Sequence, residues 1–533
     1  MKRTLSILFA LALVLAFSLV AATPVAAAST WYVDGTLGMD DGSHGGGSGA
    51  SAFKTIQYAI NDSRVGNGDT INVAAGTYNE NVVINKTNLT LKSQTALGAI
   101  IQPTTSGSNA VYITADGVTV DGFEIDGTTV AKNGILGWET SGLTIKNNKV
   151  HGAVNAWDGC GILLFSWGNN GTVYNNLIQD NEVYDTGRMG IFIMDYGPAI
   201  YTVTYGNTIT GNTVHDVWKM GTEWVDGGGA IQINVGKNCA ITNNLVYDVQ
   251  DGQRGIYMFG SAVGNTITGN TLRNNTIGIQ IWISGDQPTP QINWGGETAT
   301  TPQVHFNNIY NNSSYGAKST NIQGTTMVLD ATCNWWGAAS GPGPVGLGSG
   351  DKVTGNVTYQ PWLTEAYAPQ RSVGAPGGTA YFTPNQGSIE DLTAMGPPTP
   401  PPAGVALPYG MFNFTICCFT GSTVTLTITL PGTVPVGTKW YKYNGGAWDA
   451  LTIGGGGTNI ITVTLTDNNL VHDEDPTVGR IVDQGGPGYG GGAVGWETYP
   501  ANKVRVLLPW IALFAAIMAG VSLLVVRRRR AQS

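Results

Sequence analysis

Cysteine and charge are both scarce in this 533-residue chain. Only 11% of the residues are Asp, Glu, Lys or Arg. The five cysteines are Cys160, Cys239, Cys333, Cys417 and Cys418. Their odd number and lack of metal-ligand spacing exclude a disulfide framework and a zinc module. The adjacent pair Cys417 and Cys418 could form a strained disulfide, but we expect buried free thiols.

Basic residues are scarcest in the part of the chain between its two ends. The ends contain seven of the 26 Lys and Arg, and no Asp or Glu. Residues 29–503 therefore carry 19 basic against 35 acidic side chains, a net charge of −16. Such an acidic surface excludes nucleic acid and anionic membranes as partners, and it is compatible with neutral sugars or cations.

Helical periodicity is missing between the short β-branched runs, and what the chain has instead is a repeat. Six asparagines recur at gaps of 26 to 37 residues, each two positions before an aliphatic residue. They are Asn148, Asn181, Asn212, Asn244, Asn270 and Asn307. Pairs of Gly or Ala with Ile recur at similar spacing, beginning at Gly161, Gly190, Ala230, Gly255 and Gly278. Self-similarity at this period marks a stacked repeat.

Short strands repeated without helices predict a parallel β-coil, with each turn about 4.8 Å above the last. Inward Ile, Val and Leu would stack on their own kind. The asparagine column would lie at a bend, where Asn tolerates left-handed backbone angles and its amide can bond the turns above and below. A β-sandwich or a propeller is the alternative.

Both ends of the chain have targeting features. Residues 1–28 combine a basic start, an apolar run and a small-residue site, as in a secretory signal cut after Ala28. Residues 506–526 are uncharged and apolar, and four arginines at 527–530 follow. This length spans a bilayer, and the basic cluster stays in the cytoplasm. We expect a secreted chain anchored in the cell membrane, with an extracellular body and a cytoplasmic tail at 527–533.

Residues 29–90 contain the fragments YVDG, TIQYAI, GDTINV and GTYNENVVI. This pattern resembles the amino-terminal cap of the right-handed parallel β-helix proteins grouped as pectin-lyase-like, and NWWG at 334–337 resembles their closing turn. The resemblance implies a right-handed β-helix over 91–365, with a short amphipathic helix in the cap closing its open end.

Alternating strands with Pro/Gly turns over 379–488 predict a small β-sandwich after a linker at 366–378. This block resembles the choice-of-anchor (type U) modules of bacterial surface proteins. A Gly-rich linker at 489–505 then leads to the membrane segment. The predicted class is all-β: a right-handed parallel β-helix, a sandwich and a transmembrane helix.

Loops beside the Gly-Ile column of a β-coil would form one groove, and here they carry indoles and carboxylates. Aromatic rings suit the apolar face of a sugar, and acidic groups suit its hydroxyls. The predicted substrate-binding residues are Trp157, Trp218, Trp224, Lys219 and Asp251. Other aromatic candidates, in loops after the column, are Trp138, Trp167, Tyr196, Trp282 and Trp294. Packing of these indoles against the coil is the alternative.

The predicted function is binding, with possible cleavage, of an extracellular polysaccharide. In a hydrolase, Asp158, Asp195 and Asp226 are the candidate carboxylates. In a lyase, Arg188, Arg254 or Lys219 would abstract a proton beside a uronic carboxylate, with Asp-bound calcium neutralising charge. No GHG, RxK, DPH, WxDH or RxPxxR motif is present, so no catalytic residue carries over from the resemblance. A non-catalytic structural or adhesive surface protein is the other alternative.

Calcium is the one cofactor that the sequence suggests. The column Asp185, Asp216 and Asp248 would stack carboxylates whose repulsion a cation could relieve, although solvated turn aspartates are the favoured explanation. Oxygen donors are also dense in the sandwich, at Asp467, Asn469, Asp473, Asp475 and Asp483. Their spacing is not that of an EF-hand.

Overall fold

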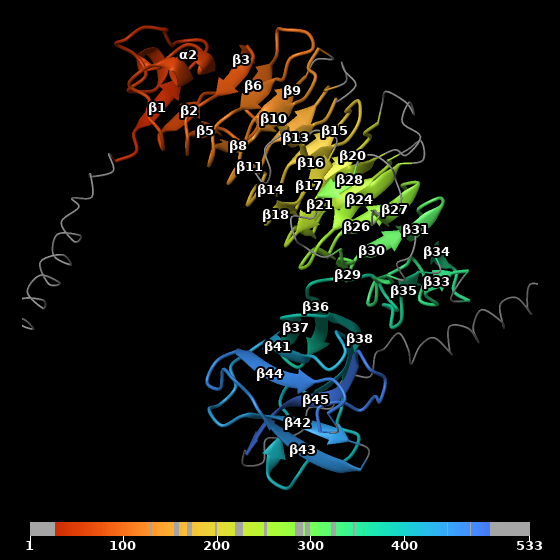
Figure 1. Cartoon of the computed structure of the whole chain (residues 1–533). Coiled ribbons are helices and arrows are strands. Elements are labelled where there is room, and N and C mark those ends of the chain that lie inside the picture. The colour runs from red at the N-terminus through yellow and green to blue at the C-terminus, as the bar shows by residue number, and fades with distance from the viewer. Residues whose placement is uncertain are drawn as a thin grey trace, which may run out of the picture. The chain divides into compact units, whose positions relative to one another are not determined.

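The computed structural model describes residues 27–490 in two compact units (Figure 1). Within that range it leaves out 128–129, 154–158, 168–172, 198–199, 219–227, 250–252, 283–290, 294–298, 321–326, 345–346, 355, 445 and 470. Unit 1 comprises Met1–Ala331 and Pro342–Thr358, and unit 2 comprises Thr332–Gly341 and Tyr359–Ser533. The predicted membrane segment 506–526 and nearly all of the predicted signal lie outside the described residues. Among the described residues, no helix has the length and apolar character to cross a bilayer.

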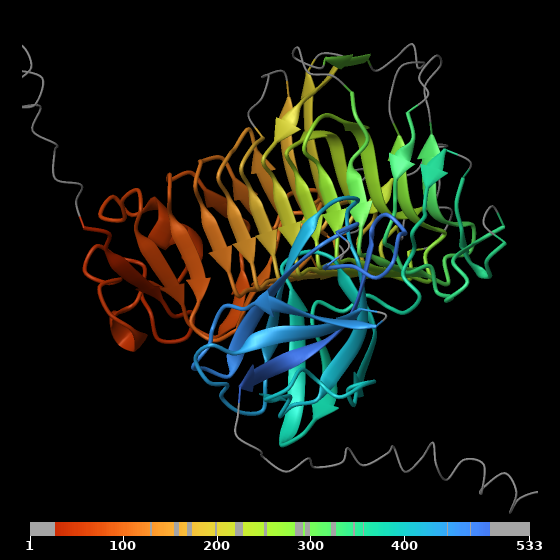
Figure 2. The ribbon, with the colours of Figure 1, turned by 90° about the horizontal axis from the view of Figure 1, so that it is seen from below.

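Unit 1 is a coil of three parallel sheets, which Figure 2 shows as strands lying side by side along its length. Sheet A contains β1 (Thr30–Val33), β2 (Thr70–Val73), β5 (Thr90–Ser93), β8 (Thr119–Asp121), β11 (Thr144–Lys146), β14 (Leu177–Gln179), β19 (Thr208–Thr210), β22 (Ala240–Thr242), β25 (Thr266–Thr268) and β29 (Gln303–His305). Sheet B contains β3 (Gly76–Asn79), β6 (Ala99–Gln102), β9 (Glu124–Asp126), β12 (Lys149–His151), β15 (Glu182–Tyr184), β20 (Thr213–His215), β23 (Leu245–Tyr247), β26 (Thr271–Arg273) and β30 (Asn308–Tyr310).

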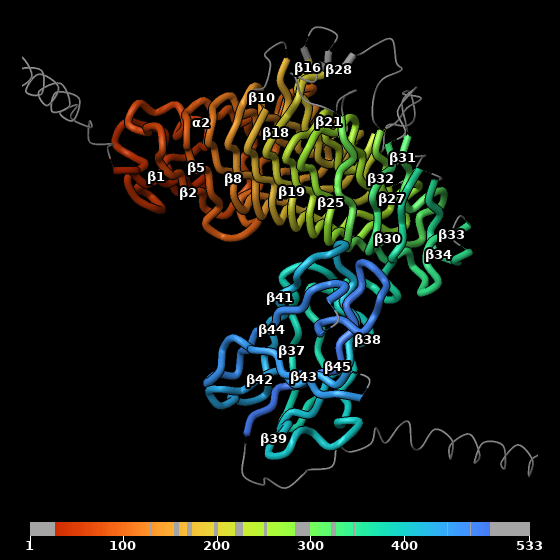
Figure 3. Tube along the Cα trace, turned by 60° about the horizontal axis from the view of Figure 1, so that its bottom comes forward, coloured from red at the N-terminus to blue at the C-terminus, as the bar shows by residue number. Residues whose placement is uncertain are grey.

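Sheet C supplies the third side of each coil. Its main strands are β4 (Val82–Ile84), β7 (Val111–Ile113), β10 (Ile135–Trp138), β13 (Ile162–Trp167), β16 (Ile191–Gly197), β21 (Gly229–Lys237), β24 (Arg254–Ser261), β27 (Ile277–Trp282) and β31 (Tyr315–Thr320). At its edge lie β17 (Ile200–Thr202), β18 (Thr204–Tyr205) and β28 (Gln291–Asn293), and short pairs join β32 (Leu329–Asp330) to β35 (Val357–Thr358) and β33 (Pro342–Gly343) to β34 (Gly350–Lys352). From β2 onward the main strands follow the order A, B, C in each coil, and Figure 3 traces the chain through these coils. The sandwich and propeller alternatives for this region are therefore wrong, because both need antiparallel sheets.

The Gly-Ile column stacks in vertical register. Consecutive Cα partners in sheet C are Ile162, Ile191, Ile231, Ile256 and Ile279, and all five side chains are fully buried. Each contributes about 1.5–3 kcal/mol by leaving water. The glycines beside them are needed for space: a Cβ on Gly161 would lie 2.3 Å from Val183 Cγ1 and 2.8 Å from the Gly190 carbonyl oxygen.

The asparagine column is a continuous buried ladder. Each Nδ2 donates to the Oδ1 of the next asparagine at 2.9–3.1 Å, from Asn148 through Asn307. Each of those Oδ1 atoms also accepts from the backbone N–H of the asparagine before it, at 2.9 Å. The prediction that the amides bond the neighbouring turns is confirmed.

The left-handed residue at this bend is the one before the ladder asparagine. Examples are Asn147 (φ 56°), Asp180 (φ 53°) and Asn243 (φ 55°). The expectation that the ladder asparagines themselves turn the chain is thus wrong by one position. The ladder residue contributes its amide, while the preceding residue takes the left-handed backbone angle; it is Asn, Asp or Gly before five of the ladder asparagines and Phe306 (φ 58°) before Asn307.

The predicted cap helix is present as α2 (Ile56–Asn61), after a short 3-10 turn, η1 (Gly49–Ser51). The Thr55 side chain accepts from the Tyr58 N–H, and Glu80 accepts from the N–H groups of Ile56 and Gln57. The helix buries Ile56, Ala59 and Ile60. It packs against β1, β2 and β4 of the first coils, as the prediction of a closed end requires.

Unit 2 contains two antiparallel sheets. One contains β36 (Arg371–Ala375), β37 (Gly378–Pro384), β41 (Thr423–Thr429) and β44 (Ile460–Thr466). The other contains β38 (Ser388–Met395), β39 (Val405–Ala406), β40 (Met411–Cys417), β42 (Lys439–Asn444), β43 (Ala447–Thr452) and β45 (Arg480–Gly490). Both sheets contribute buried side chains to one core, with Phe382 against Phe412 at 4.9 Å between ring centroids. The β-sandwich prediction is confirmed, although β36 already begins within the stretch 366–378 that was interpreted as a linker.

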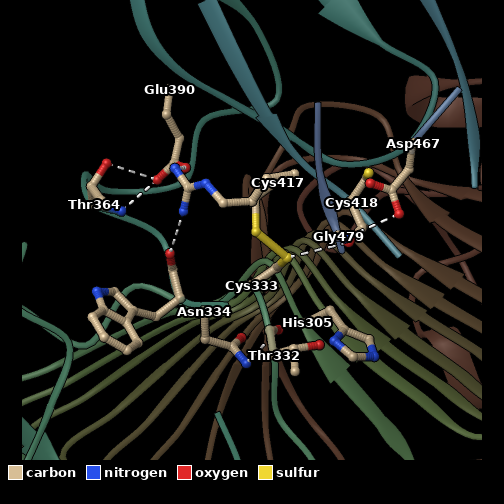
Figure 4. Close-up of a disulfide and its surroundings, with 12 residues drawn as sticks. His305, Thr332, Cys333, Asn334, Thr364, Glu390, Cys417, Cys418, Asp467 and Gly479 are labelled. Atoms are coloured by element: carbon tan, nitrogen blue, oxygen red, sulfur yellow. Dashed lines mark hydrogen bonds and ion pairs between the residues drawn. A yellow bond between two sulfur atoms is a disulfide. The ribbon is translucent and has the colours of Figure 1, made fainter. Parts of the chain in front are cut away.

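A disulfide joins Cys333 to Cys417 in unit 2, with the Cα atoms 5.9 Å apart (Figure 4). It connects the segment at 332–341 to the end of β40. The free-thiol prediction is therefore wrong for Cys417. Cys418 is a buried thiol, as expected, and Cys160 and Cys239 are buried thiols as well. The sequence could not identify the pair, because the partners are 84 residues apart.

Candidate functional site

The outer face of sheet C is built by two-residue alternation along its strands. In β13, Ile162, Leu164 and Ser166 are fully buried inside the coil. The residues between them point outward, and Trp167 at the end of the strand is 52% exposed. Alternation of this kind is the ordinary geometry of a strand with one face in a core.

Seven aromatic rings form a continuous run on this face. Their successive centroid distances are Trp138–Phe165 5.1 Å, Phe165–Trp167 6.0 Å, Trp167–Tyr196 5.1 Å, Tyr196–Tyr201 4.8 Å, Tyr201–Phe259 5.1 Å and Phe259–Trp282 4.1 Å. We call these seven residues the aromatic run. The run extends from β10 to β27, five steps of the coil or about 24 Å.

A cavity of about 400 Å³ opens beside the first part of the run. Its aromatic walls include Trp138, Phe165, Trp167, Phe192, Tyr196 and Tyr201. Lys132, Asn133 and Arg188 add polar groups to the same wall. Asn133 is held in place because its Nδ2 donates to Asn109 Oδ1 at 2.9 Å and its Oδ1 accepts from the Cys160 N–H at 3.1 Å. A mostly apolar wall with a few fixed polar groups is typical of a ligand site.

The Tyr201 hydroxyl and the Arg254 guanidinium are the next polar groups on this face. Burial raises the pKa of Tyr201 to about 12, so its hydroxyl keeps its proton throughout the neutral range. Arg254, a candidate base, donates from Nε to Gln280 Oε1 at 2.6 Å and lies 5.0 Å from the Tyr257 ring centroid. This guanidinium is held as a cation, because a deprotonated arginine is not available in proteins.

The predicted catalytic residues do not converge among the described residues. Arg188 lines the cavity. Asp195 is fully buried, on the inward side of β16 shared with Ile191 and Ile193. A polysaccharide on the outer face would not reach that carboxylate. Asp158 and Asp226 lie outside the described residues.

Of the predicted substrate-binding residues, only Trp218 can be placed. It is 5% exposed, with the Arg188 guanidinium carbon 6.0 Å from its ring centroid. Trp218 therefore packs beneath a cavity residue and does not line the surface. The remaining four, Trp157, Trp224, Lys219 and Asp251, lie outside the described residues. In contrast, Trp138, Trp167, Tyr196 and Trp282 lie on the outer face, within strands of sheet C and not in the loops where they were expected. Trp294 lies outside the described residues.

The proposed calcium column lies at the bend between sheets B and C. Asp185, Asp216 and Asp248 have φ of 50°, 48° and 55°. Later coils have Asn274 and Asn311 with the same left-handed backbone. That conformation by itself accounts for Asp and Asn at this bend. In the described parts of the chain no three His, Cys, Asp or Glu side chains form a metal cluster, so calcium remains an untested prediction.

The sequence reading missed Phe165, Tyr201 and Phe259, although they complete the aromatic run. Phe165 could have been found, because alternation along ILLFSW places it on the same face as Trp167. Tyr201 and Phe259 could not, because their ring contact joins β17 to β24 across more than 50 residues.

Comparison with known proteins supports the coil and points to one relative. The family model described as "Right handed beta helix region" matches residues 76–293. Because crossovers between parallel strands are also almost always right-handed, unit 1 is a right-handed β-helix, as predicted. A "Cell surface glycoprotein" of Methanothermus fervidus is 39% identical over 110 residues. That match covers 20% of this chain and 18% of the relative, so the chain matches under a fifth of its relative's length.

Solved structures give more distant likenesses. The Dettilon tailspike protein has a TM-score of 0.35 and 15% identity, covering 79% of this chain and 88% of its own. The A-module of the Azotobacter vinelandii mannuronan C-5 epimerase AlgE4 has a TM-score of 0.31 and 14% identity, covering 62% of this chain and 97% of its own. The catalytic unit of a GH87 alpha-1,3-glucanase from Streptomyces thermodiastaticus has a TM-score of 0.30 and 14% identity, covering 63% of this chain and 69% of its own. These likenesses assign no residue role or activity to this chain.

Proposed function

We propose that this chain is a cell-surface protein whose β-helix binds an extracellular polysaccharide on the outer face of sheet C. The observation that carries the proposal is the aromatic run, seven rings in contact with one another over about 24 Å of the coil. A linear ligand could contact several of these rings at once.

The chemistry of the face favours a sugar polymer over a protein or nucleic acid partner. Flat rings cover the apolar face of a pyranose, while neighbouring amide and cationic groups bind hydroxyl or carboxylate oxygens. Asn133, Lys132 and Arg188 provide such groups in the cavity. The net charge of −16 over residues 29–503 repels nucleic acid.

The surface location is part of the same proposal. The M. fervidus relative is a cell surface glycoprotein, and residues 1–28 and 506–526 have the composition of a secretory signal and a membrane anchor. The sandwich of unit 2 would act as a choice-of-anchor (type U) module carrying the β-helix outside the cell. Protease accessibility of the sandwich on intact cells tests this orientation.

A polysaccharide lyase is the second candidate, and the position of Arg188 in the cavity wall is the observation that favours it. As a cation, Arg188 would pair with the uronic carboxylate of the substrate and so favour loss of the neighbouring proton. A hydrolase would need Asp158 and Asp226. A purely structural or adhesive coat protein would show neither binding nor turnover.

Retention of the purified full chain on immobilised polysaccharides tests the proposal. Trp167→Ala should weaken retention about tenfold, equivalent to about 1.4 kcal/mol, because it removes the most exposed ring of the run. Tyr184→Ala is the matched control, since Tyr184 stacks on His151 and His215 on the outer face of sheet B. Equal loss in both variants, or no retained glycan, would contradict the proposal. Unsaturated products that disappear in Arg188→Ala would establish the lyase.

A further inference from the structure

A lysine lies in the core of the unit 2 sandwich. Lys442 occupies an inward position of β42, two residues after Trp440, and both side chains are fully buried. On the neighbouring strand β45, Asp483 is also fully buried. Charged residues are almost never enclosed in this way, because leaving water costs an ion several kcal/mol.

Two carboxylate side chains lie close to the Lys442 amine. Lys442 Nζ lies 3.2 Å from Asp483 Oδ2 and 3.6 Å from Glu474 Oε1, and it donates to the Val482 carbonyl at 3.3 Å. Asp483 Oδ2 and Glu474 Oε1 are both buried and accept no hydrogen bond. The carboxylate oxygens nearest the amine are therefore without a hydrogen bond, whereas Asp483 Oδ1 accepts one from Trp440 Nε1.

The electrostatics favour neutral groups at this position. Burial raises the pKa of Asp483 and also that of Glu474. Burial, and next the charge of Lys442, lower the pKa of the neighbouring His472, so this ring is neutral as well. In a dry core, moving the lysine proton to Asp483 removes two opposite charges that water no longer solvates. Such a transfer would leave an amine beside a carboxylic acid, the pair of groups that can condense to an amide.

We propose that Lys442 and Asp483 join through an intramolecular amide bond, formed with Glu474 as the proton carrier. The Nζ lone pair attacks Cγ of the protonated Asp483, and an N–C bond forms. Glu474 takes one proton from Nζ and delivers it to the Oδ2 hydroxyl, the C–O bond breaks, and one water leaves. Amine and acid thus become amide and water, with no oxidant, reductant or cofactor.

The surroundings suit this reaction. Trp440 Nε1–H donates to Asp483 Oδ1 at 3.1 Å, where negative charge develops on the attacked carboxyl. Gly485, the Cα partner of Lys442, leaves room for that contact: a Cβ there would lie 2.0 Å from Trp440 Nε1 and 2.7 Å from Asp483 Oδ1. Lys442 and Asp483 occupy diagonal positions on adjacent strands, within reach of a long side chain.

The bond would clamp β42 to β45, the last described strand before the carboxy-terminal linker. A chain pulled from that end could then unravel only as far as Asp483. This inference does not depend on polysaccharide binding.

Peptide mass spectrometry of the purified full chain tests the bond. Trypsin does not cleave after a lysine whose Nζ is an amide. The expected product of the reduced, digested protein is a branched species in which residues 440–480 are joined to 481–503, with a mass lower than the sum of the two peptides by one water. Complete cleavage after Lys442, giving linear peptides, would overturn the proposal.

Variants test the role of each group. Glu474→Gln, which cannot accept the proton, should lose at least nine-tenths of the branched peptide while keeping the near-ultraviolet circular dichroism of the wild type. Lys439→Arg is the matched control, because Lys439 is exposed on the same strand and arginine keeps the tryptic site, and this variant should keep the branched peptide. A Glu474→Gln protein that cross-links as fully as the wild type would remove Glu474 from the mechanism.

Discussion

Replacing one asparagine in the middle of the buried ladder tests how the coil is held together. In Asn212→Ala the side chain loses all of its partners in a fully enclosed site. Asn212 Nδ2 donates to Asn244 Oδ1 at 3.0 Å and to the Ile178 carbonyl at 2.9 Å, and its Oδ1 accepts from the Asn181 N–H at 2.9 Å.

The expected cost follows from the backbone groups left without these bonds. Removing the amide leaves the Asn181 N–H and the Ile178 carbonyl without this partner in a dry interior. At about 1–3 kcal/mol for each unsatisfied group, the variant should lose about 4 kcal/mol of stability around these coils. The matched control is Asn243→Gly in the same bend. Asn243 is exposed with φ 55°, a backbone angle that glycine adopts freely, so its change should stay within about 0.5 kcal/mol.

Hydrogen exchange followed by mass spectrometry in increasing urea separates the two units and localises the loss. Peptides from β14 to β25 should exchange faster in Asn212→Ala, while peptides of unit 2 should be unchanged. A loss below about 1 kcal/mol, equal to that of the control, would refute the view that the ladder is a dry network whose every bond is required.

Three further predictions concern other parts of the chain. Cys417→Ser should lower the stability of unit 2 by about 4.5 kcal/mol, since the disulfide closes an 84-residue loop; thermal unfolding of the wild type with reductant should match the variant, and insensitivity to both changes would contradict this. Burial raises the pKa of Glu80 above 4.5 in the folded protein. Its contribution to stability is therefore complete below the pKa that Glu80 has in the unfolded chain, and it is lost as pH rises through the pKa that Glu80 has in the folded protein. In urea titrations, Glu80→Gln should therefore gain stability relative to wild type as pH rises from about 4 to 7. A difference in the free energy of unfolding between the two proteins that stays constant with pH would count against the raised pKa of Glu80. Gly161→Ala should cost about 1–3 kcal/mol, because its Cβ would overlap a valine methyl and a carbonyl oxygen, and an unchanged urea midpoint would show that the coil can widen there.

Much of the β-helix could be predicted because its information is local and repeated. A residue that takes part in the ladder needs the same neighbours in every coil, so the asparagine spacing and the Gly-Ile pairs already specify which residues stack. The cap helix was equally visible, since Thr55 and the apolar spacing after it are local signals. The outward Trp138, Trp167, Tyr196 and Trp282 follow from the same register.

The rest depends on contacts between distant segments. No spacing indicates that Cys333 meets Cys417, that Tyr201 bridges to Phe259, or that Asp195 points inward while Trp167 points out. The acidic residues near the end of the sandwich illustrate the same limit. In the sequence they formed one group of oxygen donors, but the fold divides them. Asp467 and Asp473 accept backbone N–H groups, whereas Asp483 turns into the core toward Lys442.

The sequence by itself determined the repeat, the strand faces and the acidic charge, because each is a property of residues near one another along the chain. Only the tertiary structure decided which rings touch, which cysteines pair and which carboxylate is enclosed with a lysine. Those outcomes depend on burial and on distances between atoms, and folding alone brings the distant strands together.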